Sequence, residues 1–74
     1  MIRVGDLVTP SPKVKENSWW AKYQYLWGME LMVIKVEKGR TIPENIIHFH
    51  NPRYGMSRWR ESYFNLVPMS LENE

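Results

Sequence analysis

Two histidines separated by a single residue are the first candidates for chemistry in this chain. His48 and His50 flank Phe49 in an apolar stretch typical of a β-strand. On such a strand both imidazoles lie on one face, about 7 Å apart, a spacing found in some zinc sites. A zinc site needs three or four ligands, the chain has no cysteine, and we expect no Asp or Glu on the neighbouring strand to complete the set. The histidines are therefore predicted to be half-exposed strand residues, and we expect no bound metal or other cofactor.

Hydrolysis or acyl transfer would need a nucleophile, a base and an orienting group that converge in one pocket. The candidates are Ser57 and Ser62, close in sequence to the histidines, and Asp6, the single aspartate. Neither a nucleophile elbow nor a glycine-rich phosphate loop accompanies them. We therefore predict that the protein is not an enzyme and has no small-molecule substrate.

A basic group follows the histidines in a predicted hairpin. Basic side chains contact phosphates and aromatic rings stack on bases, so this mixture is typical of a sequence-tolerant nucleic-acid surface. The candidate nucleic-acid contacts are Arg53, Tyr54, Arg58 and Arg60. The alternative is a solvated strand face whose arginines pair with Glu44 or Glu61. Because the net charge is only +2, nucleic-acid binding is the second of two functional hypotheses.

The first hypothesis depends on aromatic residues. Four Trp and four Tyr in 74 residues exceed what a small core needs, and many lie in residues 13–27. Tryptophan and tyrosine are enriched at protein interfaces. The candidate interface residues are Trp19, Trp20, Tyr23 and Tyr25. The alternative is that these rings fold over an open end of the core and complete it, and we expect about two of them to be buried in this way.

The same segment is the hardest to assign to a secondary structure. Asn17 and Ser18 could cap a short helix that presents several rings on one face, whereas Tyr23, Tyr25 and Trp27 alternate as in a strand. We predict a long loop that is ordered only in part.

Length limits the stability of this chain. Residues 1–68 are predicted to form one domain, followed by a frayed acidic tail over 69–74. A core of this size supplies only about 3 to 5 kcal/mol, so a protein partner or a second copy is expected. The absence of cysteine and of any apolar run of about 20 residues predicts a cytoplasmic protein that does not enter the membrane.

Apolar alternation predicts five short strands. The first covers residues 4–9, the central strand 31–39, the third 45–50, the fourth 57–60 and the last 66–67. Residues 61–65 suit a single 3₁₀ turn before the last strand. Alternation places Trp59 and Phe49 in the core. In the central strand, Leu31 and Val33 interrupt the alternation, which predicts that its first half is covered on both sides. Together these features predict an all-β fold, a small and strongly bent five-stranded barrel.

Several stretches resemble the Src-homology-3-like small barrels, in particular the short versions common in bacteriophages. They are Gly5-Asp6-Leu7-Val8, Val33-Ile34-Lys35-Val36 with Gly39, Ile47-His48-Phe49, and Trp59 followed by Glu61-Ser62-Tyr63-Phe64-Asn65-Leu66-Val67. The resemblance covers residues 4–67, although the aromatic loop is longer than in the phage versions. It implies a binding or scaffolding module, which would act in the host cytoplasm if the gene belongs to a phage.

Overall fold

The computed structural model describes residues 2–68, which form five β-strands and four short 3₁₀ helices. The strands are β1 (Leu7–Pro10), β2 (Leu31–Lys38), β3 (Asn45–Asn51), β4 (Gly55–Arg60) and β5 (Phe64–Leu66). The helices are η1 (Pro12–Glu16), η2 (Ser18–Lys22), η3 (Gln24–Leu26) and η4 (Glu61–Tyr63). The prediction of five strands, with a 3₁₀ turn before the last of them, is confirmed. The bounds differ: β1 begins at residue 7 instead of 4, and β5 begins at residue 64, inside the stretch predicted as the 3₁₀ turn. The predicted tail over 69–74 lies outside the described residues.

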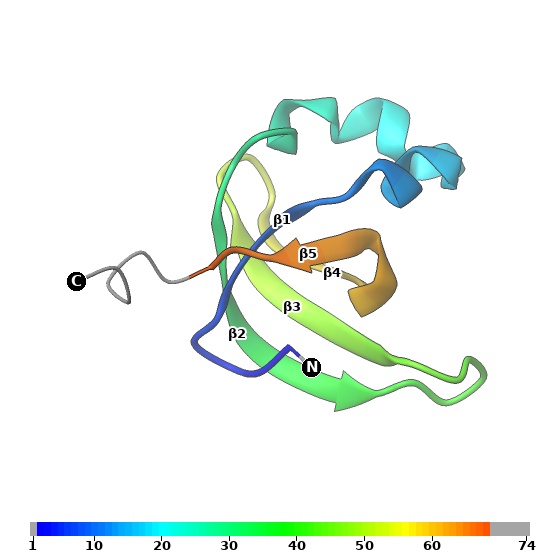
Figure 1. Cartoon of the computed structure of the whole chain (residues 1–74). Coiled ribbons are helices and arrows are strands. Elements are labelled where there is room, and N and C mark those ends of the chain that lie inside the picture. Colours follow the sequence, from blue (N-terminus) through cyan, green and yellow to red (C-terminus); the bar gives the residue numbers. More distant parts are fainter. Residues whose placement is uncertain (1, 69–74) are drawn as a thin grey trace.

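The strands form one antiparallel sheet in the order β4-β3-β2-β1-β5. The sheet is strongly curved, with β5 and β1 crossing over the concave side of β2, β3 and β4 (Figure 1). It is not closed as a barrel, so this part of the prediction is wrong. The helix η4 connects β4 to β5, and β5 pairs with β1. In this pair Val8 of β1 lies opposite Leu66 of β5, and Pro10 lies opposite Phe64. Within residues 2–68, therefore, the outer edge of β4 has no strand partner.

A β-bulge divides β2 into two parts. Val33 lies opposite Phe49 of β3, but the next paired residue, Lys35, lies opposite His48. Ile34 is thus the extra residue on the longer side of the bulge. An extra residue reverses the parity of the side chains that follow it, because successive side chains of a strand point to opposite faces.

The first half of β2 is not covered on both sides, so this expectation is wrong. Leu31 and Val33 are buried, whereas Met32 is 55% exposed and Ile34 is 41% exposed. Only one face of this half is therefore covered. Before the bulge the odd-numbered side chains of β2 face the core. After it the even-numbered ones do, and Val36 packs against the core.

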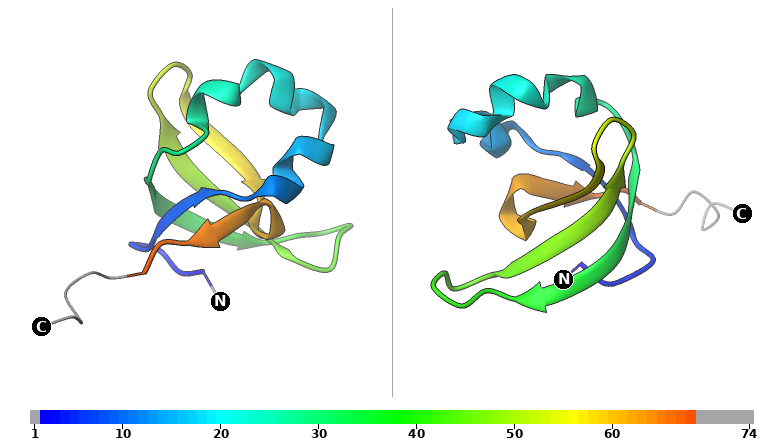
Figure 2. Two further views of the ribbon diagram at one scale, coloured as in Figure 1. Left: turned by 45° about the horizontal axis from the view of Figure 1, so that its top comes forward. Right: turned by 180° about the vertical axis from the view of Figure 1, so that it is seen from behind.

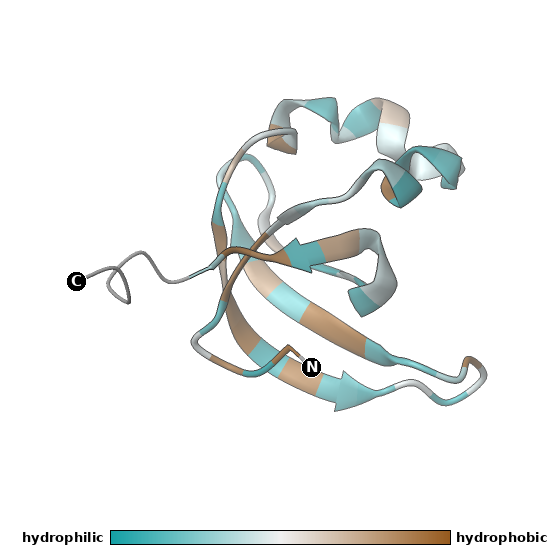
Figure 3. Cartoon of the chain, viewed as in Figure 1, coloured by the Kyte–Doolittle hydropathy of each residue, from teal (hydrophilic) through white to brown (hydrophobic). Residues whose placement is uncertain are grey.

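The core lies on the concave side of the sheet. Trp59 and Phe49 belong to it, as alternation predicts, and hydrophobic bands are separated by hydrophilic ones along β3 (Figure 3). The buried apolar residues are Ile2, Val8, Val14, Trp20, Leu26, Leu31, Val33, Ile47, Phe49, Trp59 and Phe64. Three of these come from the segment between β1 and β2, so this segment supplies part of the core.

That segment is not the predicted loop but three successive 3₁₀ helices that arch along one side of the sheet (Figure 2). Backbone N–H groups donate to the carbonyl three residues earlier at every third position. The donors are Val14, Asn17, Trp20, Tyr23, Leu26 and Met29. Asn17 and Tyr23 separate the three helices, and each helix buries one apolar side chain in the core: Val14, Trp20 and Leu26 respectively. Among residues 2–68, no helix is long and apolar enough to cross a membrane.

Candidate binding groove

An open groove of about 800 Å³ runs along the unpaired edge of β4. Its lining includes the consecutive residues 56–60 of this strand. Because successive strand side chains point to opposite faces, a groove that contacts all five must extend around the edge of the strand. Every second residue of an edge strand also directs its N–H and C=O groups outward. The groove therefore offers backbone hydrogen-bonding groups as well as side chains.

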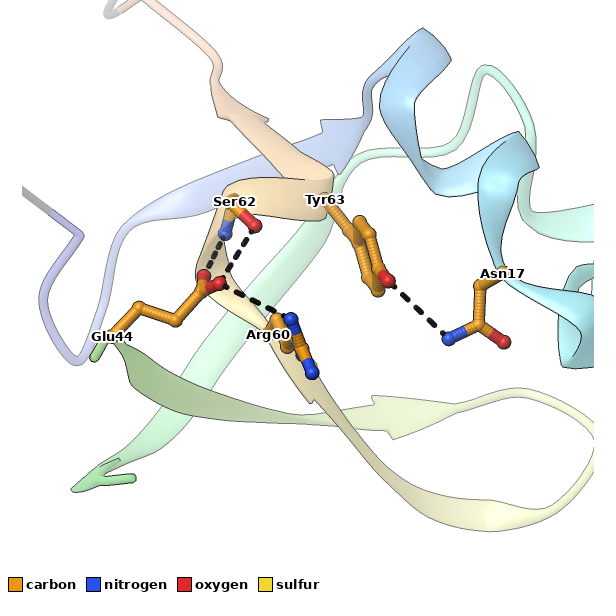
Figure 4. Close-up of polar contacts among 5 residues, drawn as sticks. All are labelled: Asn17, Glu44, Arg60, Ser62 and Tyr63. Atoms are coloured by element: carbon orange, nitrogen blue, oxygen red, sulfur yellow. Dashed lines mark hydrogen bonds and ion pairs between the residues drawn. The ribbon is translucent and has the colours of Figure 1, made fainter. Parts of the chain in front are cut away.

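Aromatic rings line the groove on the concave side of the sheet. The ring centroids of Tyr23 and Trp59 are 5.3 Å apart, and those of Trp59 and Tyr63 are 6.1 Å apart. The Asn17 side-chain amide donates a hydrogen bond of 3.5 Å to the Tyr63 hydroxyl, which joins η4 to the start of η2 (Figure 4). Trp19 completes this wall. The four rings come from η2, β4, η4 and the residue after η2.

The four predicted interface residues have different environments. Trp19 is 61% exposed, but Trp20 is only 7% exposed and belongs to the core. The Asn17 carboxamide oxygen accepts a hydrogen bond of 2.8 Å from the Trp19 N–H and so caps η2 with Trp19 on the solvent side. Tyr23 and Tyr25 are half-buried against the core. The prediction of Trp20 as a surface anchor is therefore wrong, and Trp19 is the most exposed of the four.

Basic side chains line the rest of the groove: Lys38 at the end of β2, Arg40 from the β2–β3 connection, and Arg58 and Arg60 from β4. Arg60 lies 3.9 Å from Glu44 (Figure 4). This ion pair agrees with the alternative in which the arginines pair with Glu44 or Glu61. None of the ion pairs among residues 2–68 involves the other three. The groove consequently has an excess of positive charge.

Glu44 is held in place by the 3₁₀ helix that follows β4. Its two carboxylate oxygens accept hydrogen bonds from the Ser62 N–H, at 2.8 Å, and the Ser62 hydroxyl, at 3.1 Å (Figure 4). These bonds tie the β2–β3 connection to η4. They also fix the partner of Arg60 at the end of the groove.

The tip of the β3–β4 hairpin joins residues from both predicted surfaces. The guanidinium of Arg53 lies 4.3 Å from the centre of the Tyr25 ring, and Tyr54 contacts Tyr23 with ring centroids 5.5 Å apart. The candidate protein interface and the candidate nucleic-acid contacts, which lie far apart in the sequence, are thus neighbours in space. Arg53 and Tyr54 lie beside the groove, whereas Arg58 and Arg60 line it.

Asn51 organises this hairpin, and sequence reasoning missed its role. Its side chain is fully buried. Its carboxamide oxygen accepts hydrogen bonds from the Tyr25 hydroxyl at 2.6 Å and from the N–H groups of Arg53 and Tyr54 at 2.8 and 3.2 Å. Its amide donates to the Ser57 hydroxyl at 2.9 Å. The asparagine that directly precedes proline at the end of a strand was the available signal, because such residues bond to their own turn.

The histidines lie on the convex face of the sheet, and one expectation about them is wrong. Glu37 on the neighbouring strand β2 contacts His48, with 2.8 Å between carboxylate oxygen and ring nitrogen. This hydrogen bond, aided by the charges of His48, Lys35 and Arg58, holds the pKa of Glu37 below its usual value. Across residues 2–68, no group of three or more His, Cys, Asp or Glu could hold a metal ion.

The residues considered for catalysis have local structural partners. Asp6 accepts a hydrogen bond from the Arg3 N–H at 2.8 Å in the turn before β1. Ser57 bonds to Asn51 and Ser62 to Glu44. The structure therefore places these three residues in separate hydrogen-bonded pairs. That the protein is not an enzyme stays a prediction.

Comparison with protein-family models, with curated proteins and with solved structures finds no match to this chain.

Proposed function

We propose that the protein is a non-catalytic protein-binding module that holds a segment of its partner in the groove along β4. One observation carries this proposal: four aromatic side chains from separate elements line a single groove beside an unpaired strand edge. Such rings bury a large area at low entropic cost. As the finer description of the fold, we propose a Src-homology-3-like arrangement of the five strands, of the phage type, in which the curved sheet stays open between β4 and β5.

The exposure of Trp19 supports this assignment. A tryptophan that is 61% exposed contributes little to its own core, yet a ligand that filled the groove would shield it from water. The groove volume also lies within the range of about 300 to 1,000 Å³ typical of ligand sites. Trp19 is therefore the residue whose removal should impair binding with the smallest effect on folding.

Trp27 provides a matched control. It is 46% exposed and lies outside the groove, where it contacts Lys15 at 4.4 Å from the ring centre. Peptides selected from a random twelve-residue library against the native protein should bind Trp19→Ala at least about tenfold more weakly, a loss of about 1.4 kcal/mol. They should bind Trp27→Ala with nearly native affinity. Isothermal titration calorimetry measures both.

Failure to select any binding peptide would contradict the proposal. So would peptides that bind Trp19→Ala as tightly as the native protein. Chemical shift changes in the amide spectrum should centre on residues 56–60 and on η2, and shifts confined to the convex face of the sheet would place the site elsewhere.

Nucleic-acid binding is a second candidate because Arg58 and Arg60 line the same groove as the aromatic rings. Removal of one side chain that binds a phosphate should reduce the slope of log affinity against log salt by about one unit. Arg58→Ala should therefore flatten this slope for single-stranded probes of any sequence. Absence of binding to single- and double-stranded probes at low salt would exclude this candidate.

A further inference from the structure

We propose that the partner segment is an extended, acidic stretch of protein that pairs with β4 as a sixth strand of the sheet. This inference rests on the proposed function and specifies the chemistry of the partner. Its first support is the unpaired edge of β4 within the described part of the chain. The strand has six residues, about 20 Å of pairing length.

The two sides of the groove determine which side chains such a segment needs. Trp59 and Ser57 point to the concave side of the sheet, where they pair with Ile47 and Phe49 of the core. An added strand would place every second side chain on this side, against the rings of Tyr23 and Trp59. Apolar residues are therefore expected at these alternate positions.

The remaining side chains of the segment would meet the convex side, which is basic. Arg58 points there, opposite His48, and Arg60 lies on the same side, opposite Ile46. The one carboxylate in the groove lining, Glu37, already contacts His48 at 2.8 Å. Charge complementarity therefore favours Asp or Glu at the alternate positions of the segment.

The same geometry argues against two other occupants. Pairing of β4 with β4 of a second copy would place Arg58 and Arg60 of both chains on one face of a continuous sheet, where like charges repel. A nucleic acid could contact the arginines, but it has no polypeptide backbone to satisfy the outward N–H and C=O groups of β4. An acidic protein segment uses both features of the groove.

A ten-residue peptide of alternating valine and glutamate is the probe for this proposal. It should bind the native protein and protect amide hydrogens of β4 from exchange. A peptide of alternating valine and lysine should bind at least about tenfold more weakly, as should the valine–glutamate peptide with two adjacent central amides N-methylated. N-methylation at two adjacent positions blocks both edges of the peptide strand.

Reversal of one charge on the protein provides the complementary test. Arg58→Glu should weaken binding of the valine–glutamate peptide by about tenfold and strengthen binding of the valine–lysine peptide. Lys13→Glu, an exposed change on η1 outside the groove, alters the net charge equally and should have little effect. Thermal melts confirm that both variants fold.

Four results would overturn the proposal. The first two are an N-methylated peptide and a valine–lysine peptide that each bind as tightly as the unmodified valine–glutamate peptide. The third is a single-stranded oligonucleotide that competes at the same site more tightly than this peptide. The fourth is self-association through β4 that excludes the peptide. Library peptides that bind the groove with no acidic residues would overturn the acidic partner and leave the proposed function intact. Loss of all peptide binding, from the library and from the probe, would contradict both.

Discussion

Two adjacent tryptophans test whether the 3₁₀ segment belongs to the core. Trp19 is 61% exposed and Trp20 is 7% exposed, so replacement of each by alanine compares two residues of one type in one helix. Trp20 also makes edge-to-face contacts with Trp27 and Trp59, with ring centroids 6.2 and 6.5 Å apart. We predict that Trp20→Ala strongly destabilises the fold and that Trp19→Ala does not.

The buried areas set the expected sizes of the two effects. A tryptophan side chain buries about 200 Å² when enclosed, and about 25 cal/mol per Å² gives about 4.5 kcal/mol for Trp20. This agrees with the range of about 3 to 5 kcal/mol observed for large aromatic residues replaced by alanine. For Trp19 the same estimate gives about 2 kcal/mol, which is an upper bound because the unfolded chain already buries part of this area.

Urea unfolding followed by circular dichroism measures the difference. Because a domain of this size has a total stability of only about 3 to 5 kcal/mol, Trp20→Ala should be largely unfolded without denaturant. Trp20→Phe retains part of the ring and should fold with an intermediate loss of stability, so the comparison stays quantitative. If Trp19→Ala and Trp20→Ala lose equal stability, the assignment of Trp20 to the core and of Trp19 to the groove is wrong.

Further substitutions test the core, the hairpin and the convex face. Trp59→Ala should cost about 3 to 5 kcal/mol, and a melting temperature lowered by only one or two degrees would contradict its place in the core. Asn51→Ala should cost about 1 to 3 kcal/mol because it leaves half-buried donors without their acceptor, whereas stability near the native value in urea would show that water replaces the carboxamide. The folded-state pKa of Glu37 is lowered, so its contribution is present above its ordinary pKa of 4.5 and is lost as the pH falls through the lower folded value. The stability difference between the native protein and Glu37→Gln should therefore shrink below pH 4.5, and a difference independent of pH would exclude the His48 contact as its cause. A chelator should leave the melting temperature unchanged, and a substantial rise with stoichiometric zinc would show that His48 and His50 bind metal.

Sequence patterns predicted the candidate site only in part. Side chains that share a strand face are readable from alternation, which is why the arginines at 58 and 60 were predicted to face solvent together. Their proximity to Trp19 and Tyr23 depends on contacts between segments about 40 residues apart, and no local pattern encodes such contacts. The buried asparagine at the hairpin has local partners in the turn and in β4, which its place before proline could have indicated, whereas its bond to Tyr25 depends on a segment distant in sequence.

The sequence by itself determined the all-β class, the number and order of the five strands, and the 3₁₀ turn before the last one. These follow from local causes: alternation of apolar residues, proline and glycine at the turns, and the inward parity of Trp59 and Phe49. The tertiary structure alone decided three further features. The extra residue Ile34 reversed the parity of β2, the pairing of β5 with β1 left the edge of β4 open, and the packing of η2 against the core buried Trp20 and exposed Trp19. Each of these features depends on which strand or core surface a segment packs against. Contacts between segments that are distant in sequence stabilise them, so no local pattern could predict them.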